Sequence, residues 1–319
     1  MSEFQIIKKY FSKLSKNNKS SLNLNDDVFF DNKKELVVSI DTYVEGIHFI
    51  DFNKPELVIK KIIRSSISDL VCKGVQPKYY FISGSGNNKS FASSNLRKIS
   101  KSLKQEQKKY KIHLCGGDTV YSNKLSFTIT SIGFSKKIIP RNNAKLKDDI
   151  YVTGNLGDSF AGLNILKKKY TTNIDFKKYF ENKYYQPIIN LKLTKKLFLF
   201  ANTAIDISDG LIDDLKKLIN FQKLTFKLHF EDIPISNNLK KLLSQKKLHK
   251  KNFVSRGDDY QILFTANSSK SRIISKIAKS TGIKISKIGK ITSMTHKSQI
   301  IDKKGNKIAI NETGYLHKF

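Results

Sequence analysis

The chain has 319 residues, of which 39% are hydrophobic, and this content is sufficient for packed cores and excludes a disordered polypeptide. No run of residues approaches the ~18 consecutive apolar positions of a membrane-spanning helix, and the N-terminal MSEFQIIKKYF lacks the long apolar segment of a signal peptide. We therefore expect a cytoplasmic protein that does not enter membranes.

The net charge of +32 would attract nucleic acids, anionic membranes or phosphorylated metabolites. Only five of the 59 basic residues are Arg, although the planar Arg side chain is the better group for reading bases and holding phosphates. The lysines are also spread over nearly every amphipathic segment. A solvated basic surface is the favoured interpretation. A nucleic-acid-binding protein is the alternative from a different class, but KKYFENKYYQ at 177–186 is not accompanied by an RRM, KH or zinc-finger pattern.

The two cysteines, Cys72 and Cys115, each lie beside apolar residues, and we expect both to be buried and reduced. Two cysteines in a chain of this length do not form a disulfide framework. Neither has neighbours at the spacing of a zinc site.

Helix and strand patterns alternate through the first half of the chain. Amphipathic spacing and apolar alternation predict its elements. In chain order they are a helix over about 3–15, a strand at 35–44, a helix from Pro55 to about Gly74, a strand at 78–85, a helix around 91–110 and a strand at 125–134.

A turn-rich segment at 140–149 separates these elements from a second half. That half opens with the predicted strand DIYVTGN and continues with helix and strand patterns at 204–219, 260–267 and 284–291. We predict an α/β protein of the α+β type with two domains, 1–148 and 149–319.

Several carboxylates stand at the ends of apolar strands or at the starts of helices, where they can point into a cleft. Magnesium takes oxygen ligands and is commonly shared between carboxylates and substrate phosphates. For any one residue, such as Asp69 or Asp209, a helix cap or a turn is the alternative. The set as a whole favours a metal site: Asp26, Asp27, Asp41, Asp69, Asp118, Asp206 and Asp209.

Two glycine-containing segments, GGDT at 116–119 and TGNLGDSFAG at 153–162, are candidates for close approach to phosphate. For the second, a tight turn with a helix cap from Asp158 or Ser159 is an equally good interpretation. GSGNNKS at 84–90 is not a P-loop, because Asn88 stands where the second glycine should be. No Ser/His/Asp or Cys/His nucleophile pattern is present.

Taken in order, these motifs resemble the thiamine-monophosphate kinase family, which is grouped with aminoimidazole ribonucleotide synthetase, selenophosphate synthetase and a hydrogenase maturation factor. The resemblance covers essentially the whole chain. The matching strings are EFQIIKKYF at 3–11, NDDVFF at 25–30, SIDTYVEGIHF at 39–49, SISDLVCKGVQPKYYFIS at 66–83, GGDT at 116–119, YVTGNLGDSFAGL at 151–163, AIDISDGLIDDL at 204–215, SRGDDYQILFT at 255–265 and IGKI at 288–291.

The resemblance implies an N-terminal α/β domain that dimerises and binds ATP and magnesium, and a C-terminal α/β domain that completes the active-site cleft of a homodimer. It implies direct in-line transfer of the ATP γ-phosphoryl group to the phosphate of thiamine monophosphate, without a phosphoenzyme. Such a transfer between phosphates depends on metal ions and positioning more than on protein bases, so no catalytic side chain is expected.

The family pattern assigns roles to individual residues. The implied magnesium ligands are Asp27, Asp41, Asp69, Asp118, Asp206 and Asp209. The implied ATP contacts are Gly117, Asp118, Arg141 and Ser208, and the implied substrate contacts are His48, Asp258 and Tyr315.

The chain departs from the family pattern at several positions. Leu24 and Asn25 replace the last two residues of a glycine-bearing loop, and Ile40 replaces a threonine. Arg256 replaces a glycine, and Asp258 a glutamate. Glu312 and Thr313 stand where an aromatic residue near the thiamine ring is expected, and Tyr315 is taken to substitute for it.

Another ATP-dependent enzyme of the same fold group, with a different acceptor, is the nearest alternative. The selenophosphate and hydrogenase-maturation branches use a reactive residue near the N-terminus or a cysteine at the C-terminus. This chain has no cysteine before Cys72 and none after Cys115, which favours the kinase.

Overall fold

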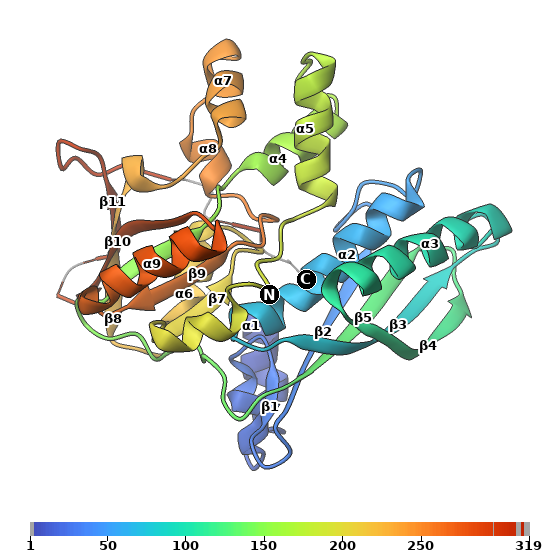
Figure 1. The fold of residues 1–319 in the computed structure, drawn as a ribbon, viewed down its shortest axis with the longest axis horizontal. Coiled ribbons are helices and arrows are strands. Elements are labelled where there is room, and N and C mark those ends of the chain that lie inside the picture. Colours follow the sequence, from blue (N-terminus) through green and yellow to red (C-terminus); the bar gives the residue numbers. More distant parts are fainter. Residues whose placement is uncertain (1–2, 296, 311–313, 316–319) are drawn as a thin grey trace.

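The computed structural model describes residues 3–295, 297–310 and 314–315. Two β-sheets lie side by side, and helix α2 (Pro55–Cys72) lies between them (Figure 1). This arrangement confirms the predicted mixed α/β class. None of the helices in the described ranges is long and apolar enough to cross a membrane.

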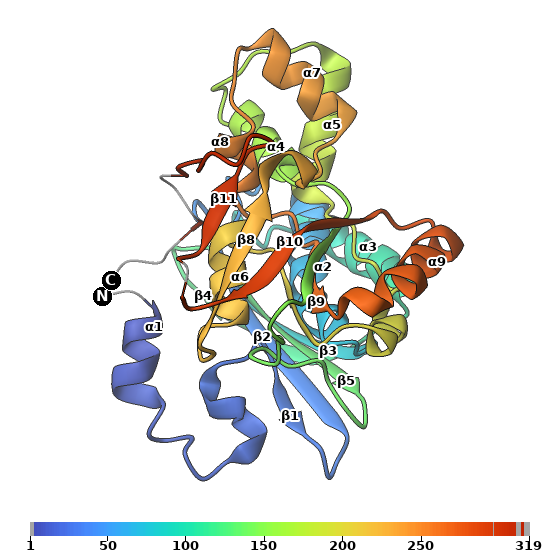
Figure 2. The ribbon, with the colours of Figure 1, turned by 90° about the vertical axis from the view of Figure 1, so that its left-hand side faces the viewer.

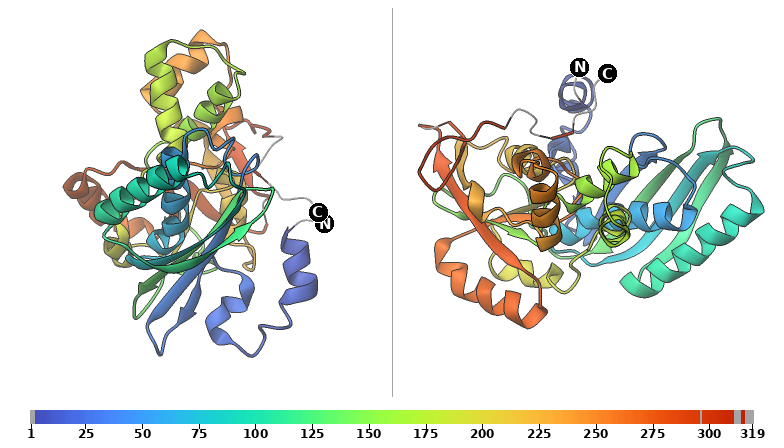
Figure 3. Two further views of the ribbon diagram at one scale, coloured as in Figure 1. Left: turned by 90° about the vertical axis from the view of Figure 1, so that its right-hand side faces the viewer. Right: turned by 90° about the horizontal axis from the view of Figure 1, so that it is seen from above.

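The first sheet has the strand order β1-β2-β5-β3-β4. Only the β3–β4 pair is parallel. Helices α2 and α3 (Ser93–Tyr110) lie on one face of this sheet (Figure 3). The strands are β1 (Phe29–Asp31), β2 (Leu36–Val44), β3 (Pro77–Gly86), β4 (His113–Tyr121) and β5 (Ser126–Phe134).

The second sheet has the order β11-β8-β10-β6-β9-β7, and all its pairs are antiparallel except β11–β8. Its helices are α6 (Leu211–Leu218) and α9 (Ser271–Thr281). The strands are β6 (Asp149–Thr153), β7 (Thr203–Asp206), β8 (Leu224–His229), β9 (Ile262–Ala266), β10 (Ile285–Ser293) and β11 (Gln299–Ile301).

Four helices form a projection above the second sheet, in which α5 and α7 rise next to each other (Figures 1 and 2). Their buried contacts include Phe180, Leu239 and Phe253, so the projection has an apolar core of its own. These helices are α4 (Asp158–Leu166), α5 (Ile174–Tyr185), α7 (Asn237–Gln245) and α8 (Lys251–Val254). Short helical segments elsewhere are α1 (Glu3–Ile6), η1 (Ile7–Phe11), η2 (Lys19–Leu24), η3 (Thr194–Leu199), η4 (Phe230–Asp232) and η5 (Ser268–Lys270).

Helix α2 joins the two sheets through one continuous apolar core. It contacts β2 and β5 of the first sheet and β7 of the second. The same buried cluster includes Ile62 of α2, Ile129 of β5 and Phe264 of β9. Residues on both sides of this helix are therefore held in fixed positions relative to each other.

Two local predictions were wrong. The first helix, expected to continue to about residue 15, ends at Phe11. The GGDT segment at 116–119, a candidate for close approach to phosphate, is part of β4, where a side chain at Gly117 would place its Cβ 1.7 Å from the Ile82 carbonyl oxygen. Cys115, expected to be buried, is exposed, because β4 is an edge strand whose residues are all exposed in the isolated chain; Cys72 is buried as expected.

The central position of α2 predicts a large stability loss when its core face is truncated. Ile62 is completely buried, so Ile62→Ala should lower the free energy of unfolding by about 2–5 kcal/mol in urea denaturation. Ile174→Ala is the matched control, because Ile174 is 80% exposed and its loss should cost less than about 0.5 kcal/mol. Similar losses in the two variants would contradict this account of the core.

Candidate active site

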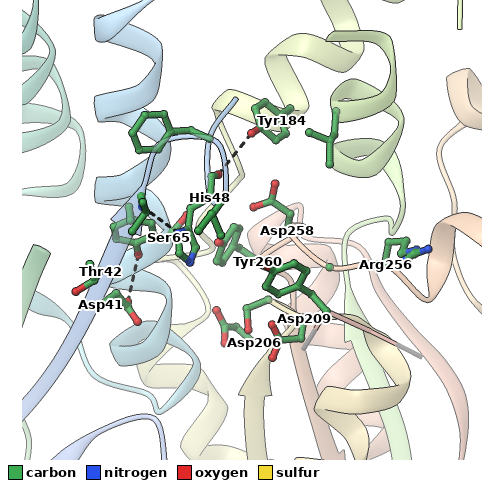
Figure 4. Close-up of a pocket in the computed structure, with 18 of the residues that line it drawn as sticks. Asp41, Thr42, His48, Ser65, Tyr184, Asp206, Asp209, Arg256, Asp258 and Tyr260 are labelled. Carbon is green, nitrogen blue, oxygen red and sulfur yellow. Dashed lines mark hydrogen bonds between the residues drawn. The ribbon is translucent and has the colours of Figure 1, made fainter. Parts of the chain in front are cut away.

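A cleft of about 940 Å³ lies between the two sheets and below the helical projection. Strand β2, helix α2, the turn after β7 and the loop 256–260 line it (Figure 4). Nine of the twelve predicted site residues line this cleft, namely Asp27, Asp41, His48, Asp69, Asp206, Ser208, Asp209, Asp258 and Tyr315. Glu312 and Thr313, where the sequence lacks an expected aromatic residue, lie outside the described residues.

Helix α2 and Lys73, the residue directly after it, present a polar stripe of Lys61, Ser65, Asp69 and Lys73, spaced four residues apart. Residues at this spacing lie on one side of a helix. Ser65 and Asp69 line the cleft, while the two lysines extend to acids at its opposite ends. The stripe therefore contributes residues to the middle of the cleft and cations to the acids at both of its ends.

Asp41, Asp69 and Asp206, which we call the carboxylate trio, are close enough to repel one another. Burial raises the pKa of Asp41 to about 6, against a hydrogen bond from the Tyr43 hydroxyl. Burial also raises the pKa of Asp206 to about 6, against a hydrogen bond from Ser68. For Asp69, burial and then the charges of Asp41 and Asp206 raise the pKa well above its ordinary value.

The carboxylate trio fits a divalent cation. Asp206 is 2% exposed, and its Oδ2 atom has no hydrogen-bond partner in the part of the chain that the structure describes. An added cation would satisfy this oxygen and relieve the repulsion within the trio. Among the described residues no three His, Cys, Asp or Glu side chains are already placed to hold an ion by themselves. Magnesium commonly binds through one or two carboxylates together with substrate phosphates and water, so this geometry suits an ion that arrives with a nucleotide.

Asp26 and Asp27 differ from the carboxylate trio, because positively charged side chains of the chain already contact them. The Lys73 ammonium is completely buried and lies 2.8 Å from Asp26 Oδ1 and 2.7 Å from Asp27 Oδ2. The Arg141 guanidinium contacts Asp27, with Nε 3.2 Å from Oδ2. Burial lowers the pKa of Lys73, but the charge of Asp26 and other neighbours outweighs burial and raises it overall.

Arg141 was predicted to contact ATP, and the structure places it beside Asp27 rather than in the lining of the cleft. Its backbone N–H also donates to Asp26 Oδ2 at 2.9 Å. Asp209 is likewise paired, because the Lys217 ammonium contacts both Asp209 and Asp214.

The opposite end of the cleft is built around Asp258. The Lys61 ammonium lies 2.5 Å from both of its carboxylate oxygens and 4.0 Å from the centre of the Tyr184 ring. Burial lowers the pKa of Lys61, and the charge of Asp258 opposes this shift. Phe160 and Leu163 add apolar surface beside this ion pair, so this end can hold an organic group.

The loop that carries Asp258 is fixed against the turn that carries Ser208. The Asp258 backbone N–H donates to the Ser208 carbonyl oxygen at 2.8 Å. A Cβ at Gly257 would lie 1.8 Å from that same oxygen, so only glycine permits this approach. Asp258 itself has a φ of 71°, in the left-handed region.

Asp118 does not line the cleft of its own chain. It pairs with Ser83, Ser83 pairs with Thr128, and Thr128 pairs with Thr42, so Asp118 lies on the same outer face of the sheet as Thr42. Asp41, one residue earlier in β2, points to the opposite face. Strands β2 and β4 are three strand spacings apart, which is about 14 Å at ~4.8 Å per spacing.

Lys61 and Lys73 are residues of the site that were not predicted from the sequence. Lysine in an amphipathic helix usually extends into solvent, and these two were counted with the basic surface. Their spacing of four residues from Ser65 and Asp69, on the side of α2 that carries the predicted carboxylate, is the signal that could have identified them.

Proteins of known function resemble this chain along its whole length. Residues 25–135 match the family described as AIR synthase related protein, N-terminal domain. The chain is 34% identical over 326 residues to the thiamine-monophosphate kinase of Buchnera aphidicola subsp. Acyrthosiphon pisum, covering 99% of this chain and 98% of that protein. It is 26% identical over 328 residues to the thiamine-monophosphate kinase of Bacillus subtilis, covering 99% of each.

Solved structures share the fold. The structure of AaThiL complexed with AMPPCP and TMP matches with a TM-score of 0.85 at 25% identity, covering 99% of this chain and 97% of that one. A HypE–HypF complex matches with a TM-score of 0.74 at 16% identity, covering 96% of this chain and 99% of that one, and this likeness concerns the fold alone.

The raised pKa of Asp206 predicts a pH-dependent stability of the metal-free protein. Because the folded-state pKa of about 6 lies above the ordinary value of 3.8, ionised Asp206 destabilises the fold above pH 6, and this effect disappears as the pH falls towards 4. In EDTA, Asp206→Asn should raise the free energy of unfolding by about 1–3 kcal/mol near pH 7.5 and by much less near pH 4.5.

Thermal and urea denaturation at the two pH values measure this difference. Asp232→Asn is the control, because Asp232 is exposed and the same chemical change should leave stability nearly unaltered at both pH values. A loss of stability in Asp206→Asn near pH 7.5 would contradict the repulsion within the carboxylate trio.

Proposed function

Because the chain belongs to the thiamine-monophosphate kinase family, we infer that it transfers the γ-phosphoryl group of ATP to thiamine monophosphate, forming thiamine diphosphate and ADP. The observation that carries this inference is 34% identity to a thiamine-monophosphate kinase over 99% of the chain. The cleft supports it, because carboxylates suited to a metal ion that would bind the phosphates line one end and apolar side chains line the other. The cytoplasmic location expected from the sequence stays a prediction.

We propose that the two ends of the cleft bind different parts of the substrates. The carboxylate trio would hold magnesium together with the ATP phosphates, and Ser208, which lines the same cleft, would contact the nucleotide; Arg141 would reach it only by leaving its contact with Asp27. Asp258 and His48 would contact thiamine monophosphate at the other end, next to Phe160 and Leu163, and Tyr315, whose backbone N–H donates to the Asp209 carbonyl oxygen, would contact it from the turn after β7. The phosphate acceptor and the γ-phosphate would meet between them.

The proposed reaction is a direct in-line displacement. A phosphate oxygen of thiamine monophosphate forms a bond to the γ-phosphorus as the bond from that phosphorus to the β–γ bridging oxygen breaks, and the bond electrons leave with ADP. Magnesium held by the carboxylate trio would neutralise the charge of the phosphates. The acceptor oxygen is already ionised near neutral pH, so the protein needs to position the two substrates and exclude water rather than remove a proton.

We also propose that the active protein is a homodimer in which Asp118 serves the site of the partner subunit. The outer face of the first sheet carries Ile40, Phe81 and Val120, which are 67%, 38% and 51% exposed. Exposed apolar side chains on one face of a sheet are typical of an interface. Within one chain, Asp118 cannot share an ion with Asp41, because magnesium–oxygen distances are about 2.1 Å.

The kinase assignment predicts a defined product. Chromatography after incubation with ATP, magnesium and thiamine monophosphate should detect thiamine diphosphate, and Asp69→Asn should reduce its formation by at least about 100-fold because the carboxylate trio is incomplete. Binding of ATP without any diphosphate formation by the wild-type chain would mean that the fold is right and the acceptor is wrong.

If Asp118 completes the site of the partner subunit, two inactive variants should complement each other. Asp118→Asn and Asp206→Asn homodimers should each be inactive, whereas their mixed dimer, purified through two different tags, should regain about half of the wild-type activity because one of its two sites is intact. If Asp118 acted within its own chain, both sites of the mixed dimer would be damaged and no activity would return. Sedimentation of the wild-type chain checks the dimer itself.

A further inference from the structure

The Asp26–Asp27 pair differs from the carboxylate trio in having its own buried cation. Lys73 is completely inaccessible, and its ammonium makes three short contacts, to Asp26 Oδ1 at 2.8 Å, Asp27 Oδ2 at 2.7 Å and the Ala204 carbonyl oxygen at 2.7 Å. Three acceptors satisfy all three N–H groups of an ammonium. This is a complete coordination shell, made by segments far apart in the sequence.

The fold fixes the position of Lys73, whereas a lysine on the surface has a flexible side chain. It directly follows the last residue of α2, and its backbone N–H donates to the Asp69 carbonyl oxygen of that helix. Ala204, which accepts from its ammonium, belongs to β7, the strand that ends at Asp206. Lys73 therefore connects the Asp26–Asp27 segment to two of the elements that carry the carboxylate trio.

The charges of these four side chains balance one another. Asp26 and Asp27 carry two negative charges, and Lys73 and Arg141 supply two positive charges in direct contact with them. The pair is therefore neutral without any metal. A divalent ion placed there would have to lie beside two fixed cations, which repel it strongly in a buried site.

We propose that Lys73 is a built-in substitute for a divalent ion: together with Arg141 it neutralises the Asp26–Asp27 pair, so that metal binds only at the carboxylate trio. This gives Asp27 a different role from the magnesium ligand expected from the sequence. Lys73 is then a positioning residue, which holds the Asp26–Asp27 segment against α2 and β7. The inference rests on the proposed use of a metal nucleotide, and it adds a statement about how many ions the site holds.

Counting bound Mn²⁺ tests this inference without turnover. The full chain is mixed with the ATP analogue AMPPCP and no acceptor, and the loss of the free Mn²⁺ signal in electron paramagnetic resonance, less the loss that the same concentration of AMPPCP causes alone, gives the number of ions per chain. Lys73→Met keeps the length of the side chain and removes its charge, so it should bind one ion more than the wild type. Lys177→Met removes the same charge at a position that is 59% exposed and should match the wild type.

A second variant keeps the test decisive if Lys73→Met does not fold. Asp27→Asn should bind as many ions as the wild type, whereas Asp206→Asn should bind at least one fewer. An unchanged ion count in Lys73→Met, or a lost ion in Asp27→Asn, would overturn the inference. Failure of the wild-type chain to bind any Mn²⁺ with AMPPCP would instead contradict the metal-dependent function itself.

Discussion

The central constraint on this structure is the electrostatic repulsion among the many carboxylates in one partly buried cleft. Like charges at such short range cannot all stay ionised without compensation, and the chain solves this in two ways. Asp26, Asp27 and Asp258 receive ammonium or guanidinium groups from the chain itself. The carboxylate trio of Asp41, Asp69 and Asp206 keeps its mutual repulsion and, in Asp206, an oxygen without a hydrogen-bond partner among the described residues. The acids without a cation of the chain in direct contact are therefore the ones proposed to bind an external cation.

Helix α2 makes the two kinds of carboxylate possible, because one of its sides packs in the core and the other faces the cleft. Its apolar side packs into a core shared by both sheets, and its polar stripe faces the cleft. A buried lysine is costly unless its ammonium is fully paired, and both Lys61 and Lys73 meet that condition through acids from other elements. The stability of the core and the electrostatics of the site are therefore set by the same helix.

Much of this site could be predicted from the sequence, because carboxylates at strand ends and helix starts keep their local context in any fold. Asp41, Asp69 and Asp206 were found in this way, and the structure places all three in one cleft. Partners from distant segments could not be predicted: a lysine on a helix gives no local sign that Asp258 will be folded onto it. The place of Asp118 depends on the strand order of the sheet, and sequence spacing does not contain that order. The exposed Cys115 was misjudged for the same reason, since apolar neighbours look alike on an edge strand and in a core.

The polar stripe of α2 also fixes the distance between the two ends of the cleft. Lys61 and Lys73 are separated by three intervals of four residues, which fixes their backbone positions about 18 Å apart at a rise of ~1.5 Å per residue. Each lysine anchors the acids at one end of the cleft, so the distance between these two groups of acids is set by rigid backbone. If the acceptor and the nucleotide bind as proposed, an acceptor that is one phosphate longer or shorter would bring its reactive oxygen to the wrong place, however well its organic part were bound. Selection by length would then be a property of the helix and not of the side chains that touch the substrate.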